Sequence, residues 1–404
     1  MCSARPMRPW RGACRSKTGK EAIDMIYLDY FSTTPCDPAV VKAMLPWFGE
    51  DFGNPHSPHG PGRKAAAVVE RTRESVARLL GVEAREIVFT SGATEANNLA
   101  IKGAVRHLAR LGDPRRRIVT VVTEHKCVLE SVRDLEKEGF EAVVLGVDSE
   151  GRVDSEALRD ALKVPTLLVS IMAANNETGV LQDIPQLAAL VKAAGALMHV
   201  DLAQMAGKMP MSLKDVDLAS VSAHKMYGPK GIGALYVRRR PRVRLAALFS
   251  GGGQERGFRS GTLPTPLVVG FGVAAELAVA NMADEAARLG LLRDVLWAKL
   301  QNSLPGIALN GGGAPHLAGA LNVCLPDGVR ALDVLEACPD VAASTGSACT
   351  AAEIAPSYVL TAMGLSAEKA SRCLRLSVGR FTSKADIDRA ASFLIAAARA
   401  CHPN

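Results

Sequence analysis

From residue 63 onward, short apolar segments alternate with longer amphipathic ones, and this alternation restricts the folds open to the chain. Segments such as EIVFT, TLLVSIMA and ALMHVD are continuous apolar runs, which are typical of strands covered on both faces. Between them lie segments such as RKAAAVVERTRESVARLLG, whose apolar residues recur at helical spacing before a glycine, Gly81. We therefore predict an α/β architecture with a large, mostly parallel sheet.

The predicted elements divide into a large and a small domain. After Ser250–Gly253 the pattern changes to one or two long helices over 267–300, followed by short strands and helices. We predict a large domain over 37–282, and a smaller α+β domain formed by 25–36 and 283–404. The predicted strands are 86–90, 116–123, 141–147, 166–173, 196–201, 218–224, 231–237, 320–325 and 373–379, and the helices of the large domain are 63–81, 93–112, 125–139, 154–162 and 185–195.

Composition excludes several classes of protein. Of 404 residues, 48% are hydrophobic and 22% charged, which is ordinary for a globular enzyme of two domains. The net charge of +7 owes much to six basic residues in the first 20, so we expect no nucleic-acid partner. The run RRRPRVR (238–244) is predicted to be solvent-exposed, with a docking patch for an acidic protein as the alternative. No stretch of about 18 consecutive apolar residues is present, so no membrane span is expected.

The N-terminal segment and the cysteines indicate in which compartment of the cell the protein is expected. Residues 1–24 are rich in arginine and lack an apolar core segment, so we expect a disordered extension and not a secretory signal, with organelle targeting as the alternative. Nine cysteines occur at scattered spacings without a C-x-x-C pair, which argues against a disulfide framework and a structural zinc site. The pattern fits a reducing compartment, and we expect the cytoplasm.

Polar residues follow several predicted strands, where ligands gather in open α/β sheets. The small-residue turn after the strand EIVFT offers free N–H groups at a helix start, which suits a phosphate. Taken singly, each residue also has a structural explanation, such as a helix cap or a turn. Together they place an acid, an imidazole, amides and a lysine at one sheet edge: Ala93, Thr94, His125, Asn176, Asp201, Gln204, Ser222, His224 and Lys225.

Pyridoxal 5'-phosphate (PLP) is the cofactor that uses such a set. It needs a lysine for covalent attachment, an acid at the pyridine nitrogen, a flat group against the ring and a phosphate seat. Lys225, Asp201 and His125 would fill the first three roles, and Ser222 and His224 could hold the phosphate. A separate loop, ASTGSACTAAEIAP, places Cys349 among small residues ahead of a helix, where an accessible thiol is expected.

Several motifs, in order from about Ile26 to the C-terminus, resemble the NifS/IscS-type cysteine desulfurases, which are class V, fold-type I PLP enzymes. They include YLDYFSTTPCDP, EIVFTSGATEANNLAIKG, TEHKCVLES, HVDLAQMAGK, SAHKMYGPKG, GGGQERGFRSGTLPT and STGSACTAAEIAPSYVLTAMG. The pairing of SAHKMYGPKG with GSACT is the most specific of these. The resemblance implies a fold-type I architecture with a large sheet of the seven-stranded type.

The resemblance also implies roles for individual residues. Lys225 matches the cofactor-binding lysine, Asp201 the pyridinium partner and His125 the stacking histidine. Gln204 matches a contact to the ring hydroxyl, and Asn176 and Arg375 match residues that hold the substrate, Arg375 through its carboxylate. Further matches to cofactor contacts are Ala93, Thr94, Ser222, His224 and Thr262, the last of which relatives supply from the other subunit.

The implied reaction converts L-cysteine to L-alanine and leaves the sulfur as a persulfide on Cys349. The implied partners are a second copy of the chain in a homodimer and a sulfur-acceptor protein such as an iron–sulfur scaffold. No resident metal is expected, and Cys349 could serve only as a transient iron–sulfur ligand. A selenocysteine lyase, a class V aminotransferase and a non-catalytic sulfur carrier are the alternatives, and the acceptor stays open.

Overall fold

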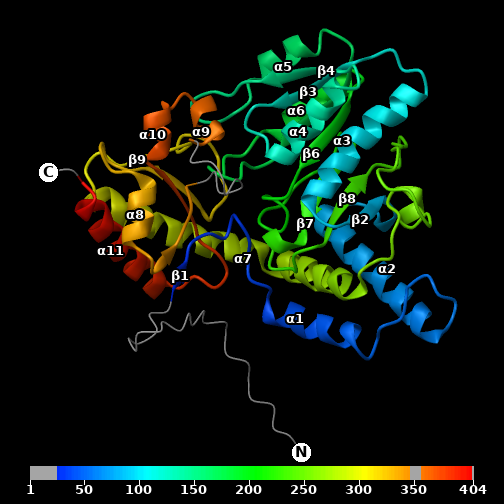
Figure 1. Cartoon of the computed structure of the whole chain (residues 1–404), viewed down its shortest axis with the longest axis horizontal. Coiled ribbons are helices and arrows are strands. Elements are labelled where there is room, and N and C mark those ends of the chain that lie inside the picture. The colour runs from blue at the N-terminus through cyan, green and yellow to red at the C-terminus, as the bar shows by residue number, and fades with distance from the viewer. Residues whose placement is uncertain (1–24, 346–355, 403–404) are drawn as a thin grey trace, which may run out of the picture.

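The computed structural model describes residues 25–345 and 356–402. Its centre is a seven-stranded sheet in the order β2-β8-β7-β6-β5-β3-β4 (Figure 1). The strands from β4 to β7 run parallel, whereas β8 is antiparallel to both β7 and β2. The predicted mostly parallel sheet is thus confirmed. The strands are β2 Ile87–Thr90, β3 Arg117–Val121, β4 Glu141–Leu145, β5 Thr166–Met172, β6 Leu197–Asp201, β7 Leu218–Ser222 and β8 Gly233–Val237.

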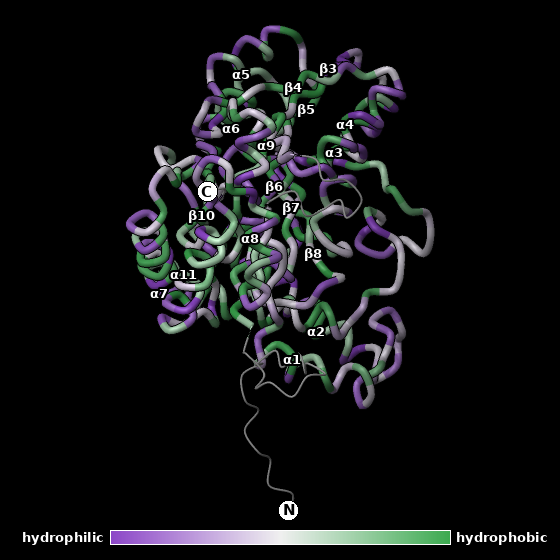
Figure 2. Tube along the Cα trace, turned by 60° about the vertical axis from the view of Figure 1, so that its left-hand side comes forward, coloured by the Kyte–Doolittle hydropathy of each residue, from purple (hydrophilic) through white to green (hydrophobic). Residues whose placement is uncertain are grey.

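Helices cover both faces of this sheet, as its apolar strands require. One hydrophobic core joins the sheet to α1, α2, α5, α6 and the first part of α7, and a second core joins the opposite face to α3 and α4. Figure 2 shows that the sheet strands are largely hydrophobic while the outer turns are hydrophilic. The helices of this part are α1 Pro38–Met44, α2 Gly60–Leu80, α3 Ala93–Arg110, α4 Lys126–Glu136, α5 Ser155–Ala161 and α6 Ile184–Ala193.

Strand β4 departs from the expectation of burial on both faces. It lies at the edge of the sheet, next to β3 alone, and Val144 is 51% exposed. A continuous apolar run indicates a strand but does not tell an edge strand from a central one. The expectation was therefore wrong for this strand.

A single helix, α7 Thr265–Ser303, links the two parts of the molecule (Figure 1). Its first half packs along α1 and α2, and its second half contacts α11 and β10. The predicted domain boundary at 282/283 falls inside this helix and stays a prediction. By length and composition α7 could cross a membrane, since the mean hydropathy of its most apolar window is 1.6. The sequence did not predict this for α7, because polar residues interrupt its run of apolar ones. Its buried residues Val268, Phe271 and Ala275 belong to the core of the large sheet, as in a core helix of a globular domain.

The smaller part is built on two short sheets. β9, β10 and β12 form an antiparallel sheet, and β1 pairs in parallel with β11. Strand β1 thereby joins the C-terminal part, and Ile26 and Leu28 lie in its core. The elements are β1 Ile26–Tyr27, β9 Ala308–Leu309, β10 Ala320–Cys324, β11 Val341–Ala342, β12 Cys373–Ser377, α8 Ala331–Ala337, α9 Tyr358–Ala362, α10 Ala367–Ser371 and α11 Lys384–Ala400.

Candidate active site

The candidate site lies where the parallel strands of the large sheet end. Asp201 is the last residue of β6, and Ser222 ends β7 just before the short turn that carries Lys225. His125 follows β3, and Asn176 follows β5. Because the carboxyl ends of parallel strands meet at one sheet edge, four segments distant in sequence converge there.

The turn between β2 and α3 has the form of an anion seat. Gly92 has φ of 150°, and no side chain caps the N-terminus of α3, so the N–H groups of its first turn are left to a ligand. The backbone of Gly233 on β8 lies so close that a Cβ there would come within 2.7 Å of the Gly92 Cα atom. A Cβ on Gly92 itself would lie 3.8 Å from Ser222 Oγ. The structure thus brings Ala93 and Thr94, at the helix start, together with Ser222.

Lys225 points toward the N-terminal segment that follows β1. Its Nζ donates hydrogen bonds to the carbonyl oxygens of Phe31, at 2.5 Å, and Ser32, at 2.9 Å. His224 Nδ1 lies 3.1 Å from Thr33 Oγ1, and burial together with the neighbouring lysines lowers the pKa of His224 to about 4. A neutral imidazole beside a lysine at neutral pH follows from that shift.

Asp201 is buried and held by two donors. The Asn97 side-chain amide donates to Oδ2 at 2.7 Å, and the Ala203 backbone N–H donates to Oδ1 at 2.8 Å. A second carboxyl, Glu124, is buried nearby, and burial and the charge of Asp201 raise its pKa well above the ordinary value. Burial thus favours the protonated form of Glu124, whereas Asp201 is the carboxyl whose two oxygens both accept hydrogen bonds at this edge.

His125 caps the N-terminus of α4, which fixes the plane of its ring. Its Nδ1 accepts the Cys127 backbone N–H at 3.2 Å and lies 3.0 Å from Cys127 Sγ. Asn97 Nδ2 also donates to that sulfur at 3.2 Å, so Asn97 links Asp201 to the His125 turn. Asn97 and Glu124 are not among the residues predicted from the sequence, although Asn97 follows Thr94 by nearly one helical turn and Glu124 directly precedes His125.

Arg375 on β12 faces this edge from the small sheet. Its guanidinium donates to the Asn176 carbonyl at 2.9 Å, to Asp29 Oδ1 at 2.7 Å and to the Ser32 hydroxyl. Two buried polar atoms at this place, Nε of Arg375 itself and Oδ1 of Asn176, have no hydrogen-bond partner within the described residues. A buried, unsatisfied N–H and a buried amide oxygen are what a ligand carrying a carboxylate and an amino group could satisfy.

Cys349 lies outside the described residues, but the chain on both sides of it is anchored at this site. Ser344 pairs with Arg375 through backbone hydrogen bonds of 2.7 and 3.3 Å. On the other side, the Ser357 hydroxyl donates to Glu177 at 2.5 Å and the Tyr358 hydroxyl donates to the Glu124 carbonyl at 2.7 Å. The segment that carries Cys349 therefore leaves and rejoins the described structure beside Arg375, Asn176 and His125.

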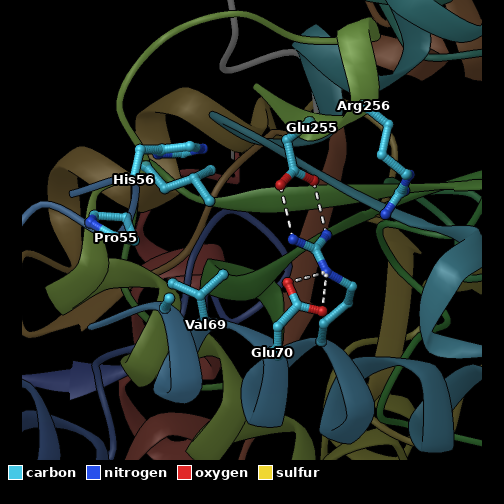
Figure 3. A pocket seen from close by; sticks show the side chains of 9 residues that line it. Pro55, His56, Val69, Glu70, Glu255 and Arg256 are labelled. Atoms are coloured by element: carbon cyan, nitrogen blue, oxygen red, sulfur yellow. Dashed lines mark hydrogen bonds and ion pairs between the residues drawn. The ribbon is translucent and has the colours of Figure 1, made fainter. Parts of the chain in front are cut away.

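The loop that precedes α7 carries Thr262 and is fixed by a buried ion pair. Glu255 accepts two hydrogen bonds from the Arg73 guanidinium, at 2.7 and 2.8 Å, in a cavity of about 210 Å3 that Pro55 and His56 also line (Figure 3). A second anchor joins Arg259 to Glu95 in the first turn of α3, at 2.8 Å. Thr262 itself is exposed, so the structure places it at the surface and not among the buried groups around Lys225.

Comparisons with known proteins agree with this geometry. The aminotransferase class-V family model matches residues 26–390, and the chain belongs to that family. Within it, the chain is 52% identical to a protein named cysteine desulfurase IscS from Anaeromyxobacter sp. (strain Fw109-5), over 92% of this chain and 91% of that one. A protein of the same name from Rickettsia akari (strain Hartford) is 48% identical, over 91% and 90% of the two chains.

Solved structures agree as well. A NifS-like protein superposes with a TM-score of 0.84 at 36% identity, covering 93% of this chain and 99% of that one. A structure titled SspA in complex with cysteine superposes with a TM-score of 0.78, also at 36% identity, over 88% and 99% of the two chains. The predicted fold and the resemblance to NifS/IscS-type cysteine desulfurases are thereby confirmed.

Proposed function

We propose that this chain is a PLP-dependent cysteine desulfurase, in which Cys349 accepts the sulfur. The reaction converts L-cysteine and the Cys349 thiol into L-alanine and a Cys349 persulfide, so one sulfur atom moves and no oxidant is consumed. The observation that carries the proposal is the convergence of Lys225, Asp201 and Arg375 on one sheet edge, with both flanks of Cys349 anchored there. Relatives named cysteine desulfurase over nine-tenths of the chain support the same activity.

The residues present fit the proposed cofactor. The uncapped start of α3, the Gly92–Gly233 approach and Ser222 offer a seat for its phosphate, and His224 is the next candidate contact. Asp201 is the acid for its pyridine nitrogen, and His125 is held rigidly enough to lie against its ring. When bound, PLP supplies a sink for the electrons left when the substrate Cα–H bond breaks.

The chain's own groups then have separate tasks. Lys225 would hold the cofactor covalently in the resting enzyme, and its free amine would be the base that takes the substrate Cα proton. Arg375 and Asn176 hold the substrate carboxylate, which accounts for the unsatisfied Nε and Oδ1 atoms there. The Cys349 thiolate attacks the substrate sulfur, and the electron pair of the broken C–S bond stays with the substrate Cβ. Cβ takes up the proton that the Cys349 thiol lost, and Lys225 returns the abstracted proton to Cα, which gives alanine and the persulfide.

We also propose that the enzyme acts as a cytoplasmic homodimer that passes its sulfur to an acceptor protein. Thr262 is exposed on a loop fixed by Glu255 and Arg259, which suits a residue that reaches the phosphate seat of a second subunit. Leu45, Phe48 and Phe52 are each more than half exposed, which is unusual for large apolar side chains and suits an interface. An iron–sulfur scaffold is the acceptor we propose.

The test is product analysis with L-cysteine as the only amino acid and dithiothreitol as reductant. A desulfurase releases alanine and sulfide in equal amounts, needs no keto acid, and loses this activity when Lys225 is replaced by alanine. Alanine formation that requires a keto acid would indicate an aminotransferase. Turnover of selenocysteine with none of cysteine would indicate a selenocysteine lyase.

A further inference from the structure

A second lysine, Lys208, lies behind the candidate site and has no role in the reaction described so far. It follows Gln204 by four residues in an irregular helical turn after β6, so the two side chains share one side of that turn. Lys208 Nζ donates to Gln204 Oε1 at 3.0 Å. The same ammonium group lies 4.5 Å from the centre of the Phe31 ring, within the range of a cation–π contact.

These contacts connect Lys208 to Lys225 through one backbone carbonyl. Gln204 Nε2 donates to the Phe31 carbonyl at 2.8 Å, and Lys225 Nζ donates to the same oxygen. An amide side chain can face either way in such a site, and the choice depends on its partners. In this structure Lys208 donates to the Gln204 oxygen, which leaves the amide N–H groups facing Phe31 and Lys225.

The surroundings of Lys208 do not neutralise its charge. It lines a cavity of about 30 Å3 together with Phe31 and Glu285, which is room for about one water molecule. Glu285 is already paired with Arg380 at 3.0 Å, and no carboxylate within 25–345 and 356–402 forms an ion pair with Lys208. Burial and the positive charge of Lys225 lower the pKa of Lys208 to about 7. The other titratable or charged groups that face it are Arg375, Tyr30 and Tyr227.

We propose that Lys208 is a positioning residue, which orients the Gln204 amide toward the cofactor and places beside the Lys225 site a lysine that forms no ion pair among the described residues. This inference rests on the proposed function, because Gln204 acts on the cofactor's ring hydroxyl only if PLP binds as proposed. In the pH range where Lys208 is protonated, its positive charge stabilises the deprotonated form of an acidic group on the ligand. Removing it therefore raises the pH at which the bound cofactor titrates.

The experiment compares wild type with Lys208→Met, which removes donor and charge, and Lys208→Arg, which keeps both. Lys214→Met is the matched control, since Lys214 is an exposed lysine shortly after Lys208 in the chain. The first readout is the pH midpoint of the visible absorption of the PLP-loaded protein. We expect the midpoint to rise by about one pH unit in Lys208→Met, to return toward the wild-type value in Lys208→Arg and to stay unchanged in Lys214→Met.

The second readout uses protein without cofactor. A lysine whose pKa is depressed in the folded state makes the folded protein more stable as pH rises from about 7 toward 10, since the unfolded chain binds the extra proton in that window. The melting temperature of wild type, relative to that of Lys208→Met, should therefore increase between pH 7 and 9. If Lys208→Met does not fold, Lys208→Gln, which keeps a donor and removes the charge, takes its place in both measurements.

The outcomes separate the two ideas. A wild-type protein that takes up no PLP refutes the proposed function, and Lys208 is then judged by the cofactor-free measurement alone. A protein that binds PLP but shows the same spectral midpoint with and without Lys208 overturns the inference. So does a cofactor-free variant whose stability follows pH as wild type does.

Discussion

The buried ion pair between Arg73 and Glu255 allows a quantitative prediction. The side chains are 4% and 2% exposed, and the Glu255 carboxylate accepts both guanidinium N–H groups as well as the Phe89 backbone N–H at 2.7 Å. Glu255→Gln keeps the shape but replaces one acceptor oxygen by a donor that faces Arg73. The guanidinium then keeps the one oxygen left on residue 255, the Ile87 carbonyl and Glu70, whose side chain is 64% exposed.

The magnitude follows from the loss of one partner in a buried pair. Such a loss costs about 3–5 kcal/mol, and we expect about 3 kcal/mol because Glu70 retains part of the interaction. At about 2.1 cal/mol/K per residue, a chain on the order of 400 residues unfolds with an entropy of about 0.8 kcal/mol/K. Glu255→Gln should therefore lower the melting temperature by about 4 °C if the chain unfolds as one unit.

Differential scanning calorimetry of the cofactor-free protein checks this value. The matched control is Glu70→Gln, which removes the exposed partner of the same arginine and should change the stability by at most about 1 kcal/mol. Equal effects of the two substitutions would refute the argument that burial makes the Glu255 pair the stronger one. So would a Glu255→Gln protein as stable as wild type.

Two further predictions concern the sheet. Gly233→Ala should weaken PLP binding at least tenfold in a fluorescence titration, because the new Cβ would lie 2.5 Å from the Val221 carbonyl oxygen and 2.7 Å from Gly92 Cα, which are both backbone atoms. The control is Gly146→Ala, whose Cβ would have no atom within 4 Å. Equal PLP affinities of the two variants would contradict the prediction. Burial lowers the pKa of His199 to about 3, so between pH 6.5 and 3 the unfolded chain binds one more proton than the folded chain. The free energy of unfolding therefore decreases by about 1.4 kcal/mol for each unit by which the pH is lowered in this range. His199→Gln should lose less melting temperature than wild type between pH 7 and 5, and an equal loss would show that His199 does not govern this window.

Local patterns in the sequence were sufficient to predict the strands and helices of the large sheet. Continuous apolar runs such as TLLVSIMA gave β5, and the glycine after RKAAAVVERTRESVARLL gave the end of α2. Strand order is set by tertiary packing, so the antiparallel β8 and the exposed edge strand β4 could not be predicted this way.

The same limit applies to the site. Lys225, Asp201 and His125 follow predicted strands and could therefore be proposed as site residues from the sequence. Asn97 and Lys208 act through partners that are remote in sequence, Asp201 and Phe31, so their part depends on distances that only the fold supplies.

The most direct test of the central claim is a single-turnover measurement with Cys349→Ala in the PLP-loaded enzyme. Wild type should form one alanine per active site from L-cysteine without reductant, together with one persulfide that an alkylating reagent traps on Cys349. The variant should keep the cofactor absorbance and form neither product at a comparable rate. Alanine formation by Cys349→Ala as fast as by wild type would contradict the account, and it would indicate a lyase that releases sulfur directly.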